Sequence, residues 1–465
     1  MNLRKKFLGI CSLAVLVFLS ACGGGANKYY GQLRTDLEEN RFSKAVELVE
    51  SSQEKIYGEK NILLFNLDAG LTNHYFQNYA ISKTFFDVAK KTFDDFYTKS
   101  VSAGALSVVA NDLVLPYYGK SYERAHIYVF NALNYILEGD ANGAAVEARQ
   151  ADAYLKTLYR DFYKDDGFVR YFSGLVFENA GYINDAYTEY GLALAAYRNS
   201  ISGVAAPQDL IDSYYTTALA LRLDSVARDI KSKYPSAKSN AIPAGQGEVI
   251  IVDYNGLSPK KVEEIITLTV GEANTYVSAT TVGSAQAKKD QTANDVAASL
   301  LMNDYIKLAF PAYQRIPHSV AAFWVETGQG DPIRSYVAQD IATIAEKTLA
   351  DEIGKIRAKT IASAAIKYTA GMVAAQAVEE KEGKLAGMAA KKALTIAMAA
   401  LAVADTRTWT TLPSDILMSR FFLPVGKHTI TVSFVNENSN VVRRQTITVE
   451  VTEGKKTFVV VETLR

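Results

Sequence analysis

The chain has 465 residues, of which 49% are hydrophobic, 50 are Lys or Arg and 50 are Asp or Glu. This hydrophobic content is sufficient for packed cores and excludes wholesale disorder. The formal net charge is zero, and no dense basic run occurs, which argues against nucleic acid as a partner. The length predicts about three domains.

The N-terminus has the pattern of a secretory signal. Arg4, Lys5 and Lys6 precede an uncharged, mainly apolar run over residues 7–21. That run is shorter than the roughly 20 residues a membrane-spanning helix needs, so a cleaved signal over residues 1–21 is predicted. The run ends in Leu-Ser-Ala-Cys22, which resembles a bacterial lipobox.

The lipobox resemblance implies that Cys22 carries a covalent lipid and begins the mature chain, with residues 22–28 as a lipidated tether and no other cofactor. Cys11 is the only other cysteine, and it lies in the removed segment, so no internal disulfide can form. Gly23 after the cysteine implies delivery to the outer membrane. We expect a periplasm-facing anchor, with surface exposure as the alternative orientation and an ordinary cleaved signal as the alternative processing.

Residues 29–240 carry a degenerate repeat of small and aromatic residues. The clearest copy consists of Gly174, Gly181, Ala186, Tyr190 and Ala193, and weaker copies begin at Leu33, Gly70 and Ala132. The offsets resemble a tetratricopeptide (TPR) repeat, in which small residues let two helices cross closely and an aromatic ring fills the gap. We predict a TPR-like α-helical array with an insertion near residues 98–120. An unrelated helical bundle is the alternative.

Tyrosine is concentrated in this region, where 22 of the 28 tyrosines lie between Tyr29 and Tyr234. We expect them to fill the space between helices and to line the concave face of the array, which leaves a peptide-binding groove open as a further use of that face. A stacking surface for cell-wall sugars is the alternative.

Residues 245–465 predict a β-rich domain. Strand-type runs occur at 249–252, 265–270, 305–310 and 320–325, and residues 428–463 have the pattern of a three-stranded antiparallel meander. An isolated meander would be marginally stable, so we expect both groups of strands to form one β-sandwich-like domain.

A long alanine-rich segment, about 334–404, separates the two groups of strands. Charged residues such as Lys359, Lys367 and Glu379 interrupt it, and its longest uncharged end, 393–404, is too short to span a bilayer. We predict a helical hairpin packed on the sheet, with Gly383 and Gly387 at a close helix crossing. Contact with a membrane or a partner helix is the alternative.

Catalytic and metal motifs are incomplete. The four histidines (His74, His126, His318 and His428) lack the spacing of a metal site. No Gly-x-Ser-x-Gly nucleophile elbow occurs. We therefore expect neither catalytic residues nor a metal.

Three distinctive stretches remain: PYYGKSYERA (116–125), GEVIIVDYNGLSPKK (247–261) and ADTRTWTTLP (404–413). Asp405 and Arg407 are predicted to form a bidentate pair beside Trp409 that locks the helical segment onto the β domain. An exposed binding site is the alternative, because aromatic and Arg side chains are frequent binding anchors. The candidate binding residues are Tyr118, Tyr122, Glu123, Arg124, Asp405, Arg407 and Trp409.

With the lipobox and the repeats, these stretches resemble a family of bacterial lipoproteins with N-terminal TPR-like repeats; the resemblance implies no particular activity. We expect a non-catalytic outer-membrane lipoprotein that acts as a periplasmic protein-interaction scaffold, or as an accessory factor in envelope assembly or cell-wall synthesis. Its partners would be the membrane, an envelope protein and, as a further candidate, peptidoglycan. The alternative is an envelope enzyme or binder that acts on peptidoglycan glycans.

Overall fold

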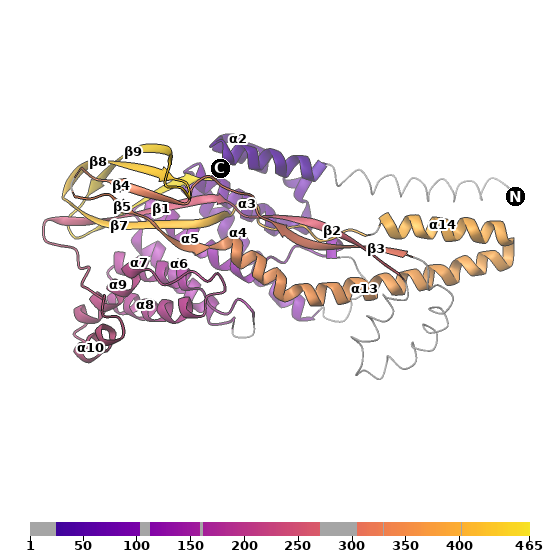
Figure 1. The fold of residues 1–465 in the computed structure, drawn as a ribbon, viewed down its shortest axis with the longest axis horizontal. Helices are drawn as coiled ribbons and strands as arrows, with labels where there is room; N and C mark the ends of the chain where they lie inside the picture. Colours follow the sequence, from indigo (N-terminus) through magenta and orange to yellow (C-terminus); the bar gives the residue numbers. More distant parts are fainter. Residues whose placement is uncertain (1–24, 103–111, 159–160, 270–304, 329, 401) are drawn as a thin grey trace.

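The structure, a computed structural model, describes residues 25–102, 112–158, 161–269, 305–328, 330–400 and 402–465 (Figure 1). These residues include a helical array, two four-stranded sheets, a two-stranded sheet and a projecting helical hairpin. The signal sequence, the lipobox and Cys22 lie outside the described residues. Residues 25–38 are helical, so residues 25–28 of the expected tether belong to this helix.

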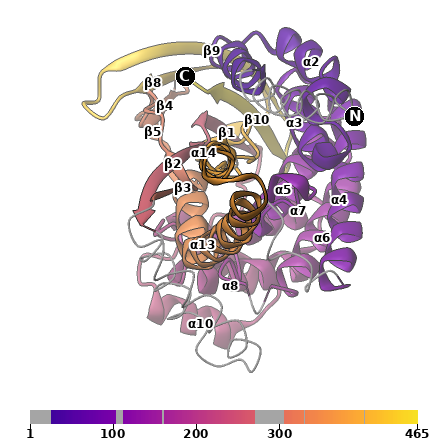
Figure 2. The ribbon, with the colours of Figure 1, turned by 90° about the vertical axis from the view of Figure 1, so that its right-hand side faces the viewer.

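The helical array consists of helix pairs joined by short turns. After the helix at 25–38 come α2 (Phe42–Glu50), α3 (Ile62–Tyr75), α4 (Tyr79–Ser102), α5 (Ser121–Leu137), α6 (Ala141–Leu155), α7 (Gly167–Asn179), α8 (Ile183–Arg198), α9 (Gln208–Ala220) and α10 (Asp224–Lys233). Each pair packs against the next, as in a TPR-like array, and together they form an arc around the strands (Figure 2).

Each turn between paired helices contains a residue with left-handed backbone geometry. These residues are Asn40, Gln77, Gly139, Gly181 and Arg222. The first four stand seven positions after the repeat starts found in the sequence. Arg222 marks a fifth pair, α9 and α10, that the small-residue pattern misses because Tyr215 stands at the start position and Lys231 at the aromatic position.

The small residues of the repeat allow close crossing of the paired helices. A Cβ atom added at Gly174 would lie 2.4 Å from Cε1 of Tyr190, and one added at Gly70 would lie 2.6 Å from Cδ1 of Phe86. In both pairs the glycine and the aromatic ring are sixteen positions apart, as the sequence pattern predicts. The ring therefore occupies the volume that a larger residue would need.

The strands of the described residues form three sheets. The first has the order β10 (Lys456–Thr463), β1 (Gln246–Leu257), β7 (Pro413–Pro424), β6 (Tyr336–Asp340). The second has the order β5 (Ile333–Arg334), β4 (Ala322–Glu326), β8 (Gly426–Val435), β9 (Val441–Val451). The third is the hairpin of β2 (Lys260–Thr269) and β3 (Tyr305–Gln314).

The predicted three-stranded meander is wrong in its last strand. β8 and β9 pair antiparallel as expected. β10 instead joins the first sheet, where it pairs in parallel with β1 from Glu248–Lys456 to Asn255–Thr463. Most side chains of β9 are exposed. In contrast, β10 buries Phe458 and Val461 in two different cores. This burial favours the position of β10 in the first sheet.

The first sheet lies between two hydrophobic cores. On one face, Val249, Ile251 and Leu417 share a core with Phe323, Ile430 and Phe434 of the second sheet. On the other face, Ile250, Val252 and Met418 belong to a core that continues into the helical array. The alternation of side chains along β1 and β7 thus joins the helical and β-rich halves of the chain.

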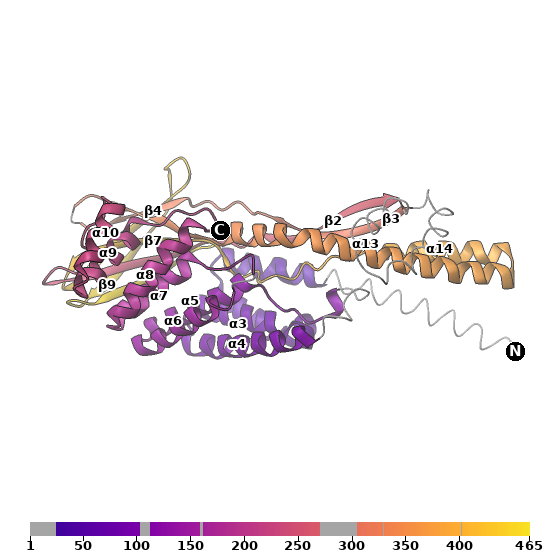
Figure 3. The same cartoon turned by 90° about the horizontal axis from the view of Figure 1, so that it is seen from below.

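The alanine-rich segment forms α13 (Ile341–Glu382) and α14 (Lys384–Ala400), which pack together as a hairpin. Arg334 and residues 336–340, expected within the helical segment, instead belong to β5 and β6. Gly383, with a φ of 94°, terminates α13 and makes no close contact, whereas Gly387 lies against the side chain of Glu379 and Gly371 lies against Leu394. Near its base the hairpin packs on β3, and its far end projects from the body (Figure 3).

Two glycine substitutions, one in the array and one in α13, should change the free energy of unfolding in opposite directions. Gly174→Ala should lower the free energy of unfolding by about 1–3 kcal/mol, because its Cβ would overlap the Tyr190 ring. Gly354→Ala in α13 meets no atom within 4 Å, so improved helix propensity should raise stability by about 1 kcal/mol. Urea denaturation followed by circular dichroism measures both. Equal effects of the two changes would contradict the proposed packing.

Candidate functional site

The first and third distinctive stretches meet at the carboxylate of Glu123, which is fully buried. It accepts hydrogen bonds from the Tyr117 hydroxyl at 2.7 Å, the Lys120 backbone N–H at 2.8 Å and the Trp409 backbone N–H at 3.0 Å. Burial raises the pKa of Glu123, and these donors oppose the rise. Glu123 therefore joins the start of α5 to the segment that follows the helical hairpin.

Arg407 makes the predicted bidentate pair with Asp405, with Nε and Nη2 donating to the carboxylate at 2.8 Å and 2.7 Å. Its Nη1 also donates to Asn61 Oδ1 at 3.0 Å and to the Leu115 carbonyl at 2.9 Å. Both of these acceptors belong to the helical array. The guanidinium thus ties the 404–409 segment to the array. The same segment also bonds to the β-rich half, where the Ala404 N–H donates to Glu263 of β2 at 2.9 Å.

Trp409 fills the interior beside this pair. Its ring contacts Phe86 and Phe130 edge-on, and its Nε1 donates to Thr411 Oγ1 at 2.8 Å. Thr411 in turn donates to the buried carboxylate of Asp68 at 2.9 Å. A buried polar chain therefore runs from the third stretch into α3.

The seven candidate binding residues lie at this junction but differ in exposure. Tyr122, Glu123 and Trp409 are buried, whereas Tyr118 is 37% exposed and packs on Phe96. Arg124 lies over the Tyr154 ring at 4.5 Å and forms an ion pair with Asp94 at 2.6 Å. The buried members connect parts of the fold, and contact of any of the seven with a partner stays a prediction.

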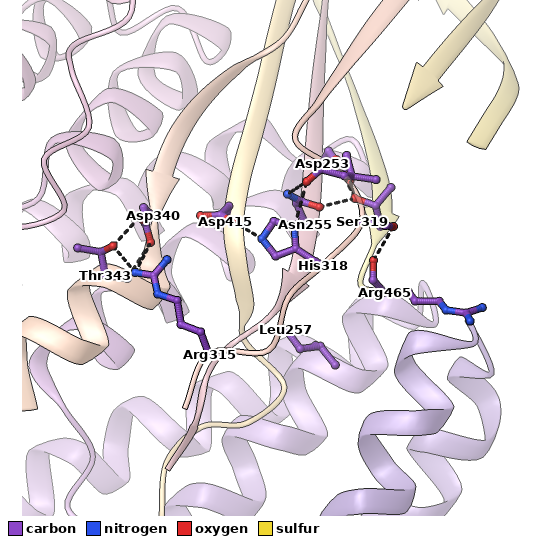
Figure 4. Close-up of polar contacts among 12 residues, drawn as sticks. Asp253, Asn255, Leu257, Arg315, His318, Ser319, Asp340, Thr343, Asp415 and Arg465 are labelled. Atoms are coloured by element: carbon purple, nitrogen blue, oxygen red, sulfur yellow. Dashed lines mark hydrogen bonds and ion pairs between the residues drawn. The ribbon is translucent and has the colours of Figure 1, made fainter. Parts of the chain in front are cut away.

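A second polar cluster surrounds His318, next to a cleft of about 970 Å³. His318 Nε2 lies 2.9 Å from Asp415 Oδ2, and Nδ1 lies 2.9 Å from the Val320 carbonyl. The hydrogen bond with Asp415 raises the pKa of His318. Figure 4 shows His318 facing Asp415, and Arg315 facing Asp340 and Thr343.

This cluster lacks a nucleophile placed for catalysis. The Ser319 hydroxyl donates to the Arg465 carbonyl at 3.1 Å instead of facing the imidazole. Both imidazole nitrogens already face protein oxygens. The hydrogen bonds of His318 and Ser319 are those of a polar cleft wall and differ from those of a nucleophile–base pair. The sequence carried no signal for it, because His318 and Asp415 are distant in the chain.

The concave face of the array, where the sequence left a peptide-binding groove open, contacts the chain's own first sheet. His74 of α3 lies 2.9 Å from the Tyr254 hydroxyl of β1, and the Tyr171 hydroxyl of α7 accepts from Arg420 of β7 at 2.9 Å. Tyr197 donates to the Ala338 carbonyl of β6 at 2.8 Å. Tyr171 and Tyr197, among the described residues, use their hydroxyl groups to bind this sheet.

Large exposed apolar side chains occur on the projecting hairpin. Leu385, Met388 and Ile396 of α14 are 84%, 66% and 57% exposed. Their spacing puts them on one face of the helix, opposite Leu394 and Met398, which pack in the hairpin core. Apolar residues on two opposite faces of α14 are visible in its sequence, and this pattern could have identified the exposed apolar face.

No protein-family model matches the chain, and no curated protein matches it. Among solved structures, MamA AMB-1 is 11% identical over 46% of this chain and 94% of that chain, with a TM-score of 0.28. The Podosopora anserina putative kinesin light chain with nearly identical TPR-like repeats is 13% identical over 44% and 92%, with a TM-score of 0.29. The apo form of RapI is 9% identical over 81% and 98%, with a TM-score of 0.34. At these values no function follows from the matches.

Among the described residues, no group of three or more His, Cys, Asp or Glu side chains could hold a metal ion. Within the same residues, no helix is long and apolar enough to cross a membrane.

The buried Asp68 predicts a pH-dependent stability. Burial raises the pKa of Asp68 to about 7 from its ordinary 3.8. The folded chain therefore keeps a proton that the unfolded chain releases, so stability falls as pH rises between these two values. Asp68→Asn should remove this part of the slope, worth up to about 4 kcal/mol. Urea denaturation across this pH range measures it.

The matched control is Asp229→Asn, which changes an exposed side chain on α10. This variant should keep the wild-type slope. Burial also raises the pKa of Glu189 and Glu462 to about 7, so Asp68→Asn should flatten the slope without abolishing it. An unchanged slope in Asp68→Asn would contradict the assignment.

Proposed function

We propose that this chain is a lipid-anchored, periplasm-facing scaffold that binds an envelope protein through the α13–α14 hairpin. The observation that carries the proposal is the outer apolar face of α14, made by Leu385, Met388 and Ile396, on an arm that projects from the body (Figure 3). Exposed clusters of large apolar side chains mark interaction surfaces. A TPR-like array commonly binds through its concave face, but the first sheet fills that face here.

The charges around the apolar face favour a protein over a lipid surface. Helices that lie on membranes carry mainly Lys and Arg on their polar face. Near the tip of this hairpin, the lysines of α14 lie beside the mainly acidic end of α13, which is Glu379-Glu380-Lys381-Glu382. The ion pair of Lys391 with Glu379 at 3.0 Å joins the two helices there. A mixed polar rim around an apolar centre is typical of protein–protein interfaces.

The proposed anchor at Cys22 would hold the array close to the membrane. Residue 25 already belongs to a helix, and that helix is fastened to the body. Arg34 donates to the Ser258 carbonyl at 3.2 Å, and the Tyr29 and Tyr57 hydroxyls lie 2.8 Å apart. Only a few residues would therefore separate the lipid from the folded body, and the partner would bind within reach of the membrane.

Site-specific photocrosslinking in intact cells tests the binding arm. A photoreactive phenylalanine at Leu385 or Met388 should form an adduct with an envelope protein. The control position is Val146 of α6, which is 48% exposed and outside the arm. Adducts of equal yield at Val146, or adducts with lipid alone at the arm, would contradict the proposal.

A charge-introducing pair of variants supplies an energetic test of the same surface. Leu385→Asp combined with Met388→Asp should weaken copurification of the crosslinked protein about tenfold or more, as expected for loss of central apolar anchors. Both side chains are exposed, so the thermal midpoint should not fall. Val146→Asp should leave copurification unchanged. Retention of sacculi without any envelope protein would favour the glycan-binding alternative.

The anchor has its own test. Cys22→Ala should move the chain from the membrane fraction to the soluble periplasmic fraction, because no acyl chain could then be attached. Fractionation and immunoblotting of wild type and variant measure this. Membrane association of Cys22→Ala equal to that of the wild type would contradict a lipid anchor at this position.

A further inference from the structure

The polar cluster around His318 lies at the base of the projecting hairpin. Residues 315–321, which we call the connector, join β3 to β4 of the second sheet, and β3 itself packs on α13. From the connector, Arg315 reaches α13 and His318 reaches β7 of the first sheet (Figure 4). This short segment therefore contacts the hairpin and both four-stranded sheets.

The imidazole of His318 is held between two acceptors. Its Nε2 lies 2.9 Å from Asp415 Oδ2, and its Nδ1 lies 2.9 Å from the Val320 carbonyl. The side-chain amide of Asn255 donates to the same carbonyl at 3.0 Å. A neutral imidazole carries one N–H and cannot donate from both nitrogens, whereas the imidazolium can. With Asp415 ionised, this geometry therefore fits the protonated ring.

The second distinctive stretch of the sequence builds the position of this ring. It supplies both Asn255 and Gly256. A Cβ atom added at Gly256 would lie 2.5 Å from Cδ2 of His318, so glycine provides the space in which the ring lies. The side chains of His318 and Asp415 are only 24% and 15% exposed. Partial shielding from water strengthens the attraction between them.

Two carboxylates face each other beside the ring. Asp340 of β6 and Asp415 of β7 are cross-strand partners, and like charges directly opposite each other destabilise a sheet. The connector puts a cation beside each of them, with His318 at Asp415 and Arg315 Nη2 at 3.9 Å from Asp340. Arg315 also donates to both oxygens of Glu346, at 2.7 Å and 2.9 Å. Loss of the charge on His318 would therefore leave the repulsion between the two aspartates less screened.

The charged groups near His318 act on its pKa in opposite directions. The hydrogen bond with Asp415 raises the pKa, burial opposes the rise, and Arg315 lowers it. The other charged groups around the pair are Asp253 of β1, Asp340 of β6, Glu346 of α13, Glu437 across the cleft, and Arg465. Because the net shift is upward from 6.5, the stabilising contact is complete below pH 6.5 and is lost as the pH rises through the raised value.

We propose that His318 is a pH-dependent clamp on the base of the hairpin. While the ring is protonated, it holds the connector against β7, and Arg315 of the same connector holds the first turns of α13. Deprotonation weakens the contact with β7, so the connector and the start of α13 open more often. The clamp acts whatever the hairpin binds, because Leu385 and Met388 lie near the other end of the hairpin.

NMR titration of the full chain, carrying ¹³C-labelled histidine, tests the protonation of the ring. His318→Gln identifies the His318 signal among those of the four histidines. The signal should titrate with a midpoint above 6.5, and Asp415→Asn should move that midpoint to lower pH because the carboxylate is lost. The signal of His428 on β8 should be unaffected by Asp415→Asn. A His318 midpoint below 6.5, or one that Asp415→Asn does not move, would overturn the proposal.

Hydrogen exchange followed by mass spectrometry tests the opening of the clamp. Between about pH 6 and about pH 9, after correction for the intrinsic rate, protection of the connector and of residues 341–347 should fall about tenfold, as expected for loss of one hydrogen bond to a charged group. Residues 183–198 of α8 are the control segment and should keep their protection.

Two variants assign this pH dependence to His318. His318→Gln is uncharged at every pH, so its connector should exchange at the same corrected rate throughout the range. Asp415→Asn keeps the shape of the side chain and should already lower the protection of the connector at about pH 6. It supplies the test if His318→Gln does not fold, which the thermal midpoint would show. Full protection of the wild type at the upper pH, or wild-type pH dependence in these variants, would overturn the proposal.

Discussion

The buried polar seam between the helical array and the first sheet is the interaction on which the rest of the structure depends. At its centre the Glu248 carboxylate accepts from Arg420 at 2.7 Å and pairs with Lys456, which also reaches Glu178 of α7 at 3.1 Å. Burial alone would raise the pKa of Glu248, but Arg420 and Lys456 lower it to about 2. Buried charges are tolerated only when paired in one geometry, so this seam fixes how the sheet sits on the helices.

That placement decides which surfaces can bind. A TPR-like array is curved, and its inner helices would otherwise present tyrosines to a peptide. Here the inner helices contact β1, β6 and β7, and their tyrosine hydroxyls are used within the chain. The sheet that closes the array also carries β6 directly into α13. The same arrangement of strands therefore covers the concave face of the array and positions the α13–α14 hairpin.

Several features could be predicted from particular residues, and others could not. Gly174 with Tyr190 and Gly70 with Phe86 are local pairs within one repeat, so their spacing is visible in the sequence and their contact follows. The Asp405–Arg407 pair is equally local. Its attachment to Asn61 and Leu115 is not, because those partners are hundreds of positions away. The course of β10 also escaped prediction, since alternating apolar residues suit either a meander or a parallel partner.

The sequence by itself determined the helical repeats, the strand-forming runs, the alanine-rich hairpin and the expectation of a lipid on Cys22, because each depends on short-range spacing. Only the tertiary structure decided that the first sheet packs on the concave face and that His318 meets Asp415. These outcomes depend on contacts between distant segments, whose energies arise from burial and charge pairing, and no local pattern records which segments will meet.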